Sequence, residues 1–581
     1  MLAADCGSAV TTVVLIERVR GHYRFVARGE AASSHNTPDM DLSLGVRRAV
    51  RQIEYLVGRR LLTHDGGLIT PRRPGGDGVD AFVLVASAAA PVRTALIGLT
   101  RNLSLASAER ALVGTYAVVT GRTSAEDVQP GDGQEAPFQM LERAEPEAVV
   151  LCGGTDGGAQ RAVLRMVDTL ASYCRSRPAE ARPAVVYAGN AQLVPEVARR
   201  LADSAELRIT DNVQPTLNTG HPDGLRATMD AIYCERKLAG LPGMRQLQEW
   251  AAAALQPTAR SYAQTIQYLA GRYQLRVIGC DLGSRSAVLA FANDRQSGCV
   301  LQPELGMGSN LSTALEKVVL ERVLGWLPFA IEPGLARIIL LSAGAYAQRI
   351  SADAEGILLE QALACELLRQ VATAARADCA WPASRTASWD LIVATGRAVT
   401  RAPHPAHVAW LLLNALEPVG VSKLAIDAGN VAGTLGALAG VHPLAAEEVL
   451  EYDAFLTLGT LVALAGRARP GEVALRMGIV FPDGRREQRT IRGGSLVTIP
   501  LGSAEHVRLE LHPARGLDVG VGAPGQSAVV EAEGGTLGIV VDARGRPLAL
   551  PDDTDVRRQF IQAWLSELGI AIHPIEATLA T

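Results

Sequence analysis

The sequence predicts an α/β protein with two duplicated halves and an appended C-terminal β-rich domain. One strand–turn–strand motif occurs twice, as AADCGSAVTTVVLIE from Ala3 and IGCDLGSRSAVLAFAND from Ile278. Apolar strands alternate with amphipathic helices through both halves. Beyond Arg469, short alternating runs separated by turn residues replace this pattern. Because 581 residues exceed what one hydrophobic core supports, we expect three or more domains.

In each copy of the motif, an apolar strand brings an aspartate to a tight turn that is rich in hydroxyls. The first copy supplies Asp5, Gly7, Ser8, Thr11 and Thr12, and the second supplies Asp281, Gly283, Ser284 and Ser286. The N–H groups and hydroxyls of such a hairpin can contact phosphate oxygens, while the carboxylate holds Mg²⁺ through water. A single copy could also be an ordinary connecting turn. Two copies that face each other would hold a nucleotide's phosphates from both sides.

The similarity between the halves extends beyond the hairpins. Residues 148–173 and 390–415 each read as a buried strand, a glycine turn and an amphipathic helix, so we expect them to be counterparts. Further strands are expected near residues 82 and 336, and a buried helix at 455–466. The predicted domains are residues 1–270, 276–465 and 469–581, and the last ends in the helical pattern TDVRRQFIQAWLSELG.

Composition excludes several classes of function. A formal net charge of -4 gives no reason to expect nucleic acid or an anionic membrane as partner. No apolar run is long enough for a membrane span, and the apolar N-terminus, interrupted by Asp5, reads as a strand rather than a signal peptide. The eight cysteines form no C-x-x-C pair, which argues against zinc or haem sites. We therefore expect a reduced, cytoplasmic protein.

Several motifs, in order, resemble the glutamate mutase accessory family called MutL or GlmL, which shares only a name with the mismatch-repair protein. They are DCGSAVTTVVLIE, VLVASAAAPVRTALIGLT, VVLCGGTDGG, VVYAGN, DNVQPTLN, DLGSRSAVLAF, ELGMGSN and IVATGRAVTRAPHP, and they span residues 1 to about 440. The family is similar to actin-like ATPases, whose halves have ribonuclease H-like folds. The resemblance implies ATP and Mg²⁺ as ligands and an adenosylcobalamin-dependent mutase subunit as partner.

The resemblance also implies roles for individual residues. Asp5 and Asp281 match the Mg²⁺ anchors of the two phosphate hairpins, and Thr395 and Gly396 match the glycine turn beside the adenosine. The family's own loop GGTDGG is Gly153, Gly154, Thr155, Asp156, Gly157 and Gly158. Asp156 could serve a second metal or act as a base. Alternatively, the four glycines only let a helix start close to the sheet.

Two departures from the family pattern leave the activity open. The second hairpin reads DLGSRSAV, without a later acid, and Arg285 stands where the family has a small residue. This arginine could neutralise phosphate charge or block the site. No acid follows the strand VLVASAAA, so any phosphoryl transfer would be slow, and we expect a weak ATPase at most.

Two functions from different classes remain. The first is an ATP-binding accessory protein, a chaperone or reactivating factor that acts on the mutase through domain closure. The second is a non-catalytic scaffold with a degenerate nucleotide site that binds a protein partner. A small-molecule kinase is a third reading, disfavoured because neither a base nor a substrate motif is found.

Overall fold

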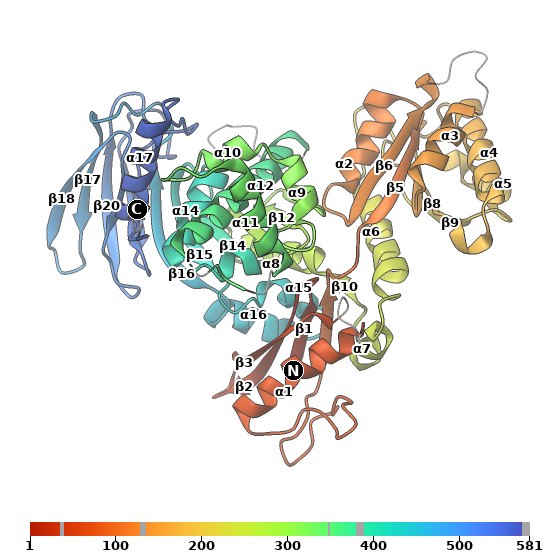
Figure 1. Ribbon diagram of the computed structural model, residues 1–581, viewed down its shortest axis with the longest axis horizontal. Helices are drawn as coiled ribbons and strands as arrows, with labels where there is room; N and C mark the ends of the chain where they lie inside the picture. Colours follow the sequence, from red (N-terminus) through yellow and green to blue (C-terminus); the bar gives the residue numbers. More distant parts are fainter. Residues whose placement is uncertain (35–39, 128–134, 347–348, 352, 379–387, 572–581) are drawn as a thin grey trace, which may run out of the picture.

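The computed structural model describes residues 1–34, 40–127, 135–346, 349–351, 353–378 and 388–571. In this part of the chain the longer strands form four sheets. The core sheets of the two halves occupy the lower and central parts of Figure 1, with an inserted domain at the upper right and the C-terminal strands at the left.

The first half is built on a five-stranded sheet of order β10-β4-β1-β2-β3. Its first three strands form an antiparallel meander, and β4 and β10 continue the sheet in parallel. The strands are β1 (Leu2–Cys6), β2 (Val10–Val19), β3 (His22–Ala32), β4 (Phe82–Ala86) and β10 (Gln256–Pro257). The β-branched run in β2 favours this extended conformation. Helix α1 (Leu42–Val57), capped by Asp41 and ended by Gly58 at φ 69°, packs on β2 and β3.

The second half repeats this arrangement. Strands β13, β12, β11, β14 and β15 follow in the same order, again with an antiparallel meander and two parallel strands. Their bounds are β11 (Val277–Leu282), β12 (Ala287–Ala292), β13 (Ser297–Gln302), β14 (Leu391–Thr395) and β15 (Gly420–Ile426). The predicted fold class, two ribonuclease H-like halves of the actin-like type, is therefore confirmed.

At the junction of the two halves, one helix from each half packs on the sheet of the other half. Helix α8 (Thr258–Tyr273), which follows β10, packs on β11 and β12 of the second sheet, whereas α15 (Ala432–Ala439) packs on β1 and β4 of the first sheet. The two helices also pack against each other, and α16 (Pro443–Tyr452) lies on β3. The second half further contains α9 (Leu311–Lys317), α10 (Leu320–Leu324), α11 (Pro333–Ala345), α12 (Ala354–Asp378), α13 (Arg397–Thr400) and α14 (Pro405–Ala415).

One expected correspondence between the halves and two expected elements are wrong. The counterpart of β14 is β4, because each lies parallel to the first strand of its sheet; residues 148–173 belong instead to an inserted domain. Residues near 336 form helix α11 rather than a strand. Residues 455–466 contain strand β16 (Leu456–Ala463) rather than a helix. Short apolar runs do not distinguish a buried strand from a buried helix, and this ambiguity explains the last two errors.

The inserted domain contains a fully parallel sheet of order β6-β5-β7-β8-β9. Its strands are β5 (Val92–Gly98), β6 (Ala117–Ser124), β7 (Ala148–Leu151), β8 (Ala184–Tyr187) and β9 (Glu206–Ile209). Its helices are α2 (Ala106–Leu112), α3 (Glu135–Ala144), α4 (Arg161–Ser176) and α5 (Val194–Leu201). Helices α6 (Asp223–Ile232) and α7 (Met244–Trp250) lead the chain back to the first half.

The C-terminal strands both extend the second sheet and form one of their own. Strands β16, β22 (Gly538–Asp542) and β19 (Leu496–Ile499) continue the second sheet beyond β15. The separate sheet consists of β18 (Arg486–Arg492), β17 (Val473–Val480), β20 (His506–Pro513) and β21 (Ala528–Glu533). Helix α17 (Thr554–Glu567) packs on β19. The predicted β-rich C-terminal region is thus present.

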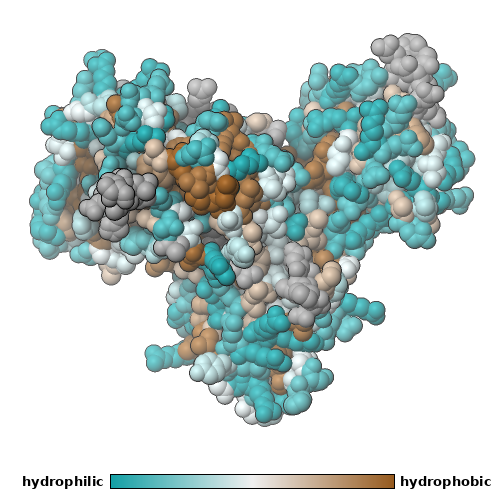
Figure 2. Space-filling view, in the orientation of Figure 1, coloured by the Kyte–Doolittle hydropathy of each residue, from teal (hydrophilic) through white to brown (hydrophobic). Residues whose placement is uncertain are grey.

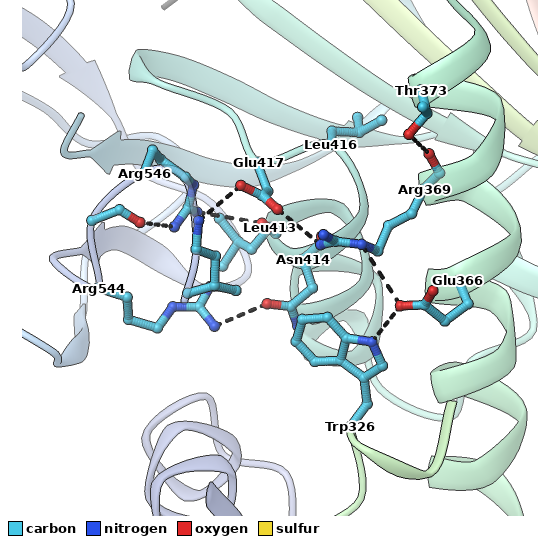
Figure 3. A network of polar contacts seen from close by, with 12 residues as sticks. Trp326, Glu366, Arg369, Thr373, Leu413, Asn414, Leu416, Glu417, Arg544 and Arg546 are labelled. Carbon is cyan, nitrogen blue, oxygen red and sulfur yellow. Dashed lines mark hydrogen bonds and ion pairs between the residues drawn. The ribbon is translucent and has the colours of Figure 1, made fainter. Parts of the chain in front are cut away.

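A buried polar network joins these strands to the second half (Figure 3). Arg544 Nη2 donates to Asp542 Oδ2 at 2.7 Å, and its Nη1 donates to Asn414 Oδ1 of α14 at 2.9 Å. Arg546 also pairs with Asp542, and all three charged side chains are buried. The two arginines hold the pKa of Asp542 well below its ordinary value. Breaking one member of such a buried set leaves the others uncompensated.

Helix α11 exposes an apolar face. Leu335, Ile338 and Leu341 are 50%, 63% and 37% exposed, while Ala336 and Leu340 face the core. Figure 2 shows the resulting apolar patch in the region of α10 and α11. Within the described residues, no helix is both long and apolar enough to cross a membrane.

Candidate functional site

The two predicted hairpins face each other across one cavity between the halves. The predicted residues that line it are Asp5, Gly7, Ser8, Thr12, Asp281, Gly283, Ser284, Ser286, Thr395 and Gly396. Two segments 276 positions apart in the sequence therefore meet, together with the predicted adenosine turn.

The first hairpin positions its side chains through the pairing of β1 with β2. Asp5 is the last but one residue of β1 and pairs with Thr12, so both lie at the cavity end of the sheet. Gly7 N donates to Val10 O at 3.0 Å, and a Cβ on Gly7 would lie 2.8 Å from that oxygen, so the turn requires glycine. Thr11 pairs with Cys6 and is fully buried, so it does not line the cavity.

The second hairpin has the same turn and an additional brace. Gly283 N donates to Ser286 O at 2.9 Å, as in the first copy. The segment 304–310, the ELGMGSN motif, holds the turn from behind, because Met307 N donates to Gly283 O at 3.0 Å and Gly308 N donates to Ser284 O at 2.8 Å. Ser309 N donates to Ser284 Oγ at 3.2 Å. The second hairpin is therefore fixed in position by backbone hydrogen bonds.

The adenosine turn lies directly against the second hairpin. Thr395 ends β14 and is paired with Asp281 of β11. Gly396 has φ +87°, and a Cβ there would lie 2.2 Å from Asp281 Oδ1, so only glycine fits. Thr395 Oγ1 donates to Asp427 Oδ2 at 2.9 Å. This contact orients Thr395 and brings a third acid close to the cavity.

The acids of the site lie in surroundings that disfavour their charged forms. Burial raises the pKa of Asp5 to about 6, against the hydrogen bond donated by Thr258 Oγ1 at 2.8 Å. Burial, and then the charges of Asp5 and Asp427, raise the pKa of Asp281 to about 7. Burial also raises that of Asp427 to about 6. No basic side chain of the described residues pairs with Asp5 or Asp281, so a cation between them would relieve the repulsion.

These two carboxylates suit Mg²⁺ better than a transition metal. Mg²⁺ is bound through one or two carboxylates plus substrate phosphates and water, rather than by a protein cage. Among the described residues, no group of three or more His, Cys, Asp or Glu side chains could hold a metal alone. The donor set therefore fits a Mg²⁺ ion that arrives with a phosphate ligand.

Sequence reasoning missed several residues of the cavity. They are Glu30, Ser87, Tyr116, Thr258, Asn430 and Gly433. Ser87 and Thr258 directly follow the parallel strands β4 and β10, and ligands of parallel sheets lie outside the carboxyl ends of the strands. That rule was the available signal for both. The residue that follows β4 is Ser87 rather than an acid. The Glu30 carboxylate forms an ion pair with Arg401 at 3.1 Å.

The family loop GGTDGG lies elsewhere. None of its residues, Gly153, Gly154, Thr155, Asp156, Gly157 and Gly158, lines the cavity; the loop follows β7 in the inserted domain. Asp156 Oδ1 accepts from Ala191 N and from Asn212 Nδ2, both at 2.9 Å. Asn190 Oδ1 accepts from Gly157 N at 3.1 Å. The loop thus joins the VVYAGN and DNVQPTLN motifs, which agrees with the structural alternative.

A second cavity opens beside the first. It shares Gly283 and Ser284 with the cavity between the hairpins, and its other lining residues come from α9, α11, α12, residues 401–403, Met307, Arg349 and Ile350. Leu340 and Ala343 of α11 reach this cavity from one side of the helix. Helix α11 therefore separates a space next to the second hairpin from the exposed apolar patch.

Comparisons with known proteins support one family. A family model described as "MutL protein" matches residues 1–454. No curated protein matches the chain. Similar solved structures include an acetone carboxylase in its nucleotide-free form, at 12% identity and TM-score 0.32, covering 84% of this chain and 80% of that chain. A glycerol dehydratase reactivase is 12% identical at TM-score 0.28, covering 76% and 100%. A PilM–PilN pilus biogenesis complex is 11% identical at TM-score 0.26, covering 76% and 98%. Such TM-scores support no conclusion about function.

Proposed function

The chain belongs to the MutL family of glutamate mutase accessory proteins, and from this premise we propose that it binds ATP·Mg²⁺ between its halves and acts on an adenosylcobalamin-dependent mutase. The observation that carries the proposal is the pair of hairpins facing each other across one cavity. Asp5 and Asp281, both without a basic partner among the described residues, would hold the ion through water. When bound, Mg²⁺ neutralises part of the phosphate charge.

The cavity is better equipped for binding than for rapid hydrolysis. Ser8, Thr12 and Ser286 place hydroxyls beside the turn N–H groups, which suits phosphate oxygens. The residue after β4 is Ser87, and Glu30, the acid of the first half that lines the cavity besides Asp5, is paired with Arg401. Without a free carboxylate to orient water, we expect hydrolysis to be slow. ATP would then act mainly by favouring the closed arrangement of the two halves.

The accessory role also needs a surface for the mutase. Helix α11 offers one, because its outer face exposes Leu335, Ile338 and Leu341 while its inner side lines the cavity beside the second hairpin. A nucleotide that moves α11 would therefore change the surface that a partner contacts. Ile338→Glu should weaken co-elution with a mutase subunit, whereas the same change at exposed Leu456 of β16 should not.

Isothermal titration of the full-length protein with ATP·Mg²⁺ tests the nucleotide proposal. We expect binding by the wild type and its loss in Asp5→Ala and Asp281→Ala, with Asp294→Ala on the exposed β12–β13 turn as a matched control. Binding that survives both cavity substitutions contradicts the proposed site. No binding by the wild type would favour the scaffold alternative, which the lack of an acid after β4 also supports.

A further inference from the structure

Arg285 is a cationic side chain among the residues that line the cavity between the two hairpins. It lies at the tip of the second hairpin, between Ser284 and Ser286, and lines the cavity with them. Its backbone is held tightly: Asn310 Nδ2 donates to Arg285 O at 3.1 Å, and a Cβ on Gly306 would lie 2.3 Å from the Arg285 carbonyl carbon. The arginine therefore projects from a rigid turn.

The guanidinium of Arg285 has no partner in the described part of the chain. Among the described residues, no hydrogen bond or ion pair is found for its side chain; the Nε is buried without a partner, while the side chain as a whole is only partly buried. Burial lowers the pKa of Arg285, and Tyr233 is the one group that opposes this effect. The carboxylates of Asp5 and Asp281 are not paired with it. Arg285, Asp5 and Asp281 thus line the same cavity, and Arg285 forms an ion pair with neither acid.

A partly buried charge without a counter-charge is less favourable than a paired one, and an anionic ligand would supply the missing charge. Arginine stays protonated, and its planar set of five donors matches phosphate oxygens. An arginine that only blocked the site could be replaced by an apolar residue of similar size without leaving a partly buried charge unpaired. The arrangement therefore favours an anionic ligand at this end of the cavity.

We propose that Arg285 binds the terminal phosphate of the nucleotide, so that the site distinguishes ligands by their number of phosphates. This inference rests on the proposed function. The hydroxyls and turn N–H groups contact phosphate oxygens from both hairpins, Asp5 and Asp281 face the metal side, and Arg285 contacts the phosphate end. ATP should then bind more tightly than ADP, and ADP more tightly than AMP.

Titration calorimetry with ATP·Mg²⁺, ADP·Mg²⁺, AMP and inorganic tripolyphosphate tests the role of Arg285. We expect Arg285→Gln to weaken ATP and tripolyphosphate binding by about 10- to 100-fold, as for the loss of charged hydrogen bonds, and AMP binding much less. Arg285→Lys should restore part of the affinity. Arg295→Gln serves as the matched control, because Arg295 is 85% exposed on the neighbouring turn. Unchanged thermal unfolding shows that the variants are folded.

The outcomes separate this inference from the proposed function. If the wild type binds ATP and Arg285→Gln binds it as tightly or more tightly, Arg285 does not contact phosphate and the inference is wrong. If the wild type does not bind ATP, the proposed function fails. In that case tripolyphosphate binding that depends on Arg285 would still support an anion site, whereas no tripolyphosphate binding overturns the inference as well.

Discussion

Replacing Asp281 by asparagine should stabilise the ligand-free protein while removing its metal site. Burial and two neighbouring acids raise the pKa of Asp281 from 3.8 to about 7. For a carboxyl group whose pKa is raised by folding, the native state binds the extra proton, so stability falls as pH rises from about 4 to 7. A shift from 3.8 to about 7 corresponds to ~4 kcal/mol. Because Asp281 retains contact with solvent in the cavity, we expect about 2 kcal/mol.

Urea unfolding of the wild type and Asp281→Asn at several pH values measures this effect. Tryptophan fluorescence reports on the second half, since Trp326, Trp410 and Trp564 lie close together there. The variant should be more stable by about 2 kcal/mol at pH 8, and the difference should shrink as pH falls and vanish below about pH 4, where the carboxyl is protonated in both the folded and the unfolded state. Asp294→Asn should show no such trend. A variant that is less stable than the wild type at pH 8 would refute the reasoning about burial.

Three further predictions concern the turn, the family loop and the C-terminal network. Gly396→Ala should abolish ATP·Mg²⁺ binding in calorimetry, because its Cβ would lie 2.2 Å from Asp281 Oδ1; unchanged affinity would remove the turn from the site. Asp156→Ala should destabilise the inserted domain by about 1–3 kcal/mol, seen as faster hydrogen exchange in β8, and leave ATP affinity unchanged. Weaker ATP binding would instead give the loop a ligand role. Asp542→Ala should destabilise the protein by about 3–5 kcal/mol in thermal unfolding, since it leaves Arg544 and Arg546 buried and unpaired; a loss below about 1 kcal/mol would contradict this account.

The duplicated halves could be predicted because each opens with the same local pattern. The strand–aspartate–glycine–strand pattern requires only neighbouring residues, and both copies form the expected hairpins. The pairing of 148–173 with 390–415 failed because a strand, a glycine turn and a helix recur in any parallel α/β domain, including the inserted one. Only the sheet neighbours of β4 and β14 show which strands are counterparts.

Cavity residues within the hairpin motif could be predicted from the sequence, whereas residues that only the fold brings to the cavity could not. Asp5 and Asp281 lie where the hairpin pattern places them. Tyr116 and Asn430 belong to segments without a recognisable motif and reach the cavity only through the packing of distant elements. Thr11 was wrongly grouped with the cavity residues, because side chains alternate along a strand and its neighbour Thr12 takes the cavity side.

The continuous sheet of the second half has a mechanical consequence. Strands β16, β22 and β19 extend the sheet from β15 without a break, and the Asp542 network fastens them to α14. The C-terminal strands must therefore turn with the second half as one rigid arm. A small rotation of the second half about the cavity would displace the outer strand β18, at the far left of Figure 1, by a larger distance than the residues at the cavity. These strands lie beyond residues 1–454, the region that the family model matches.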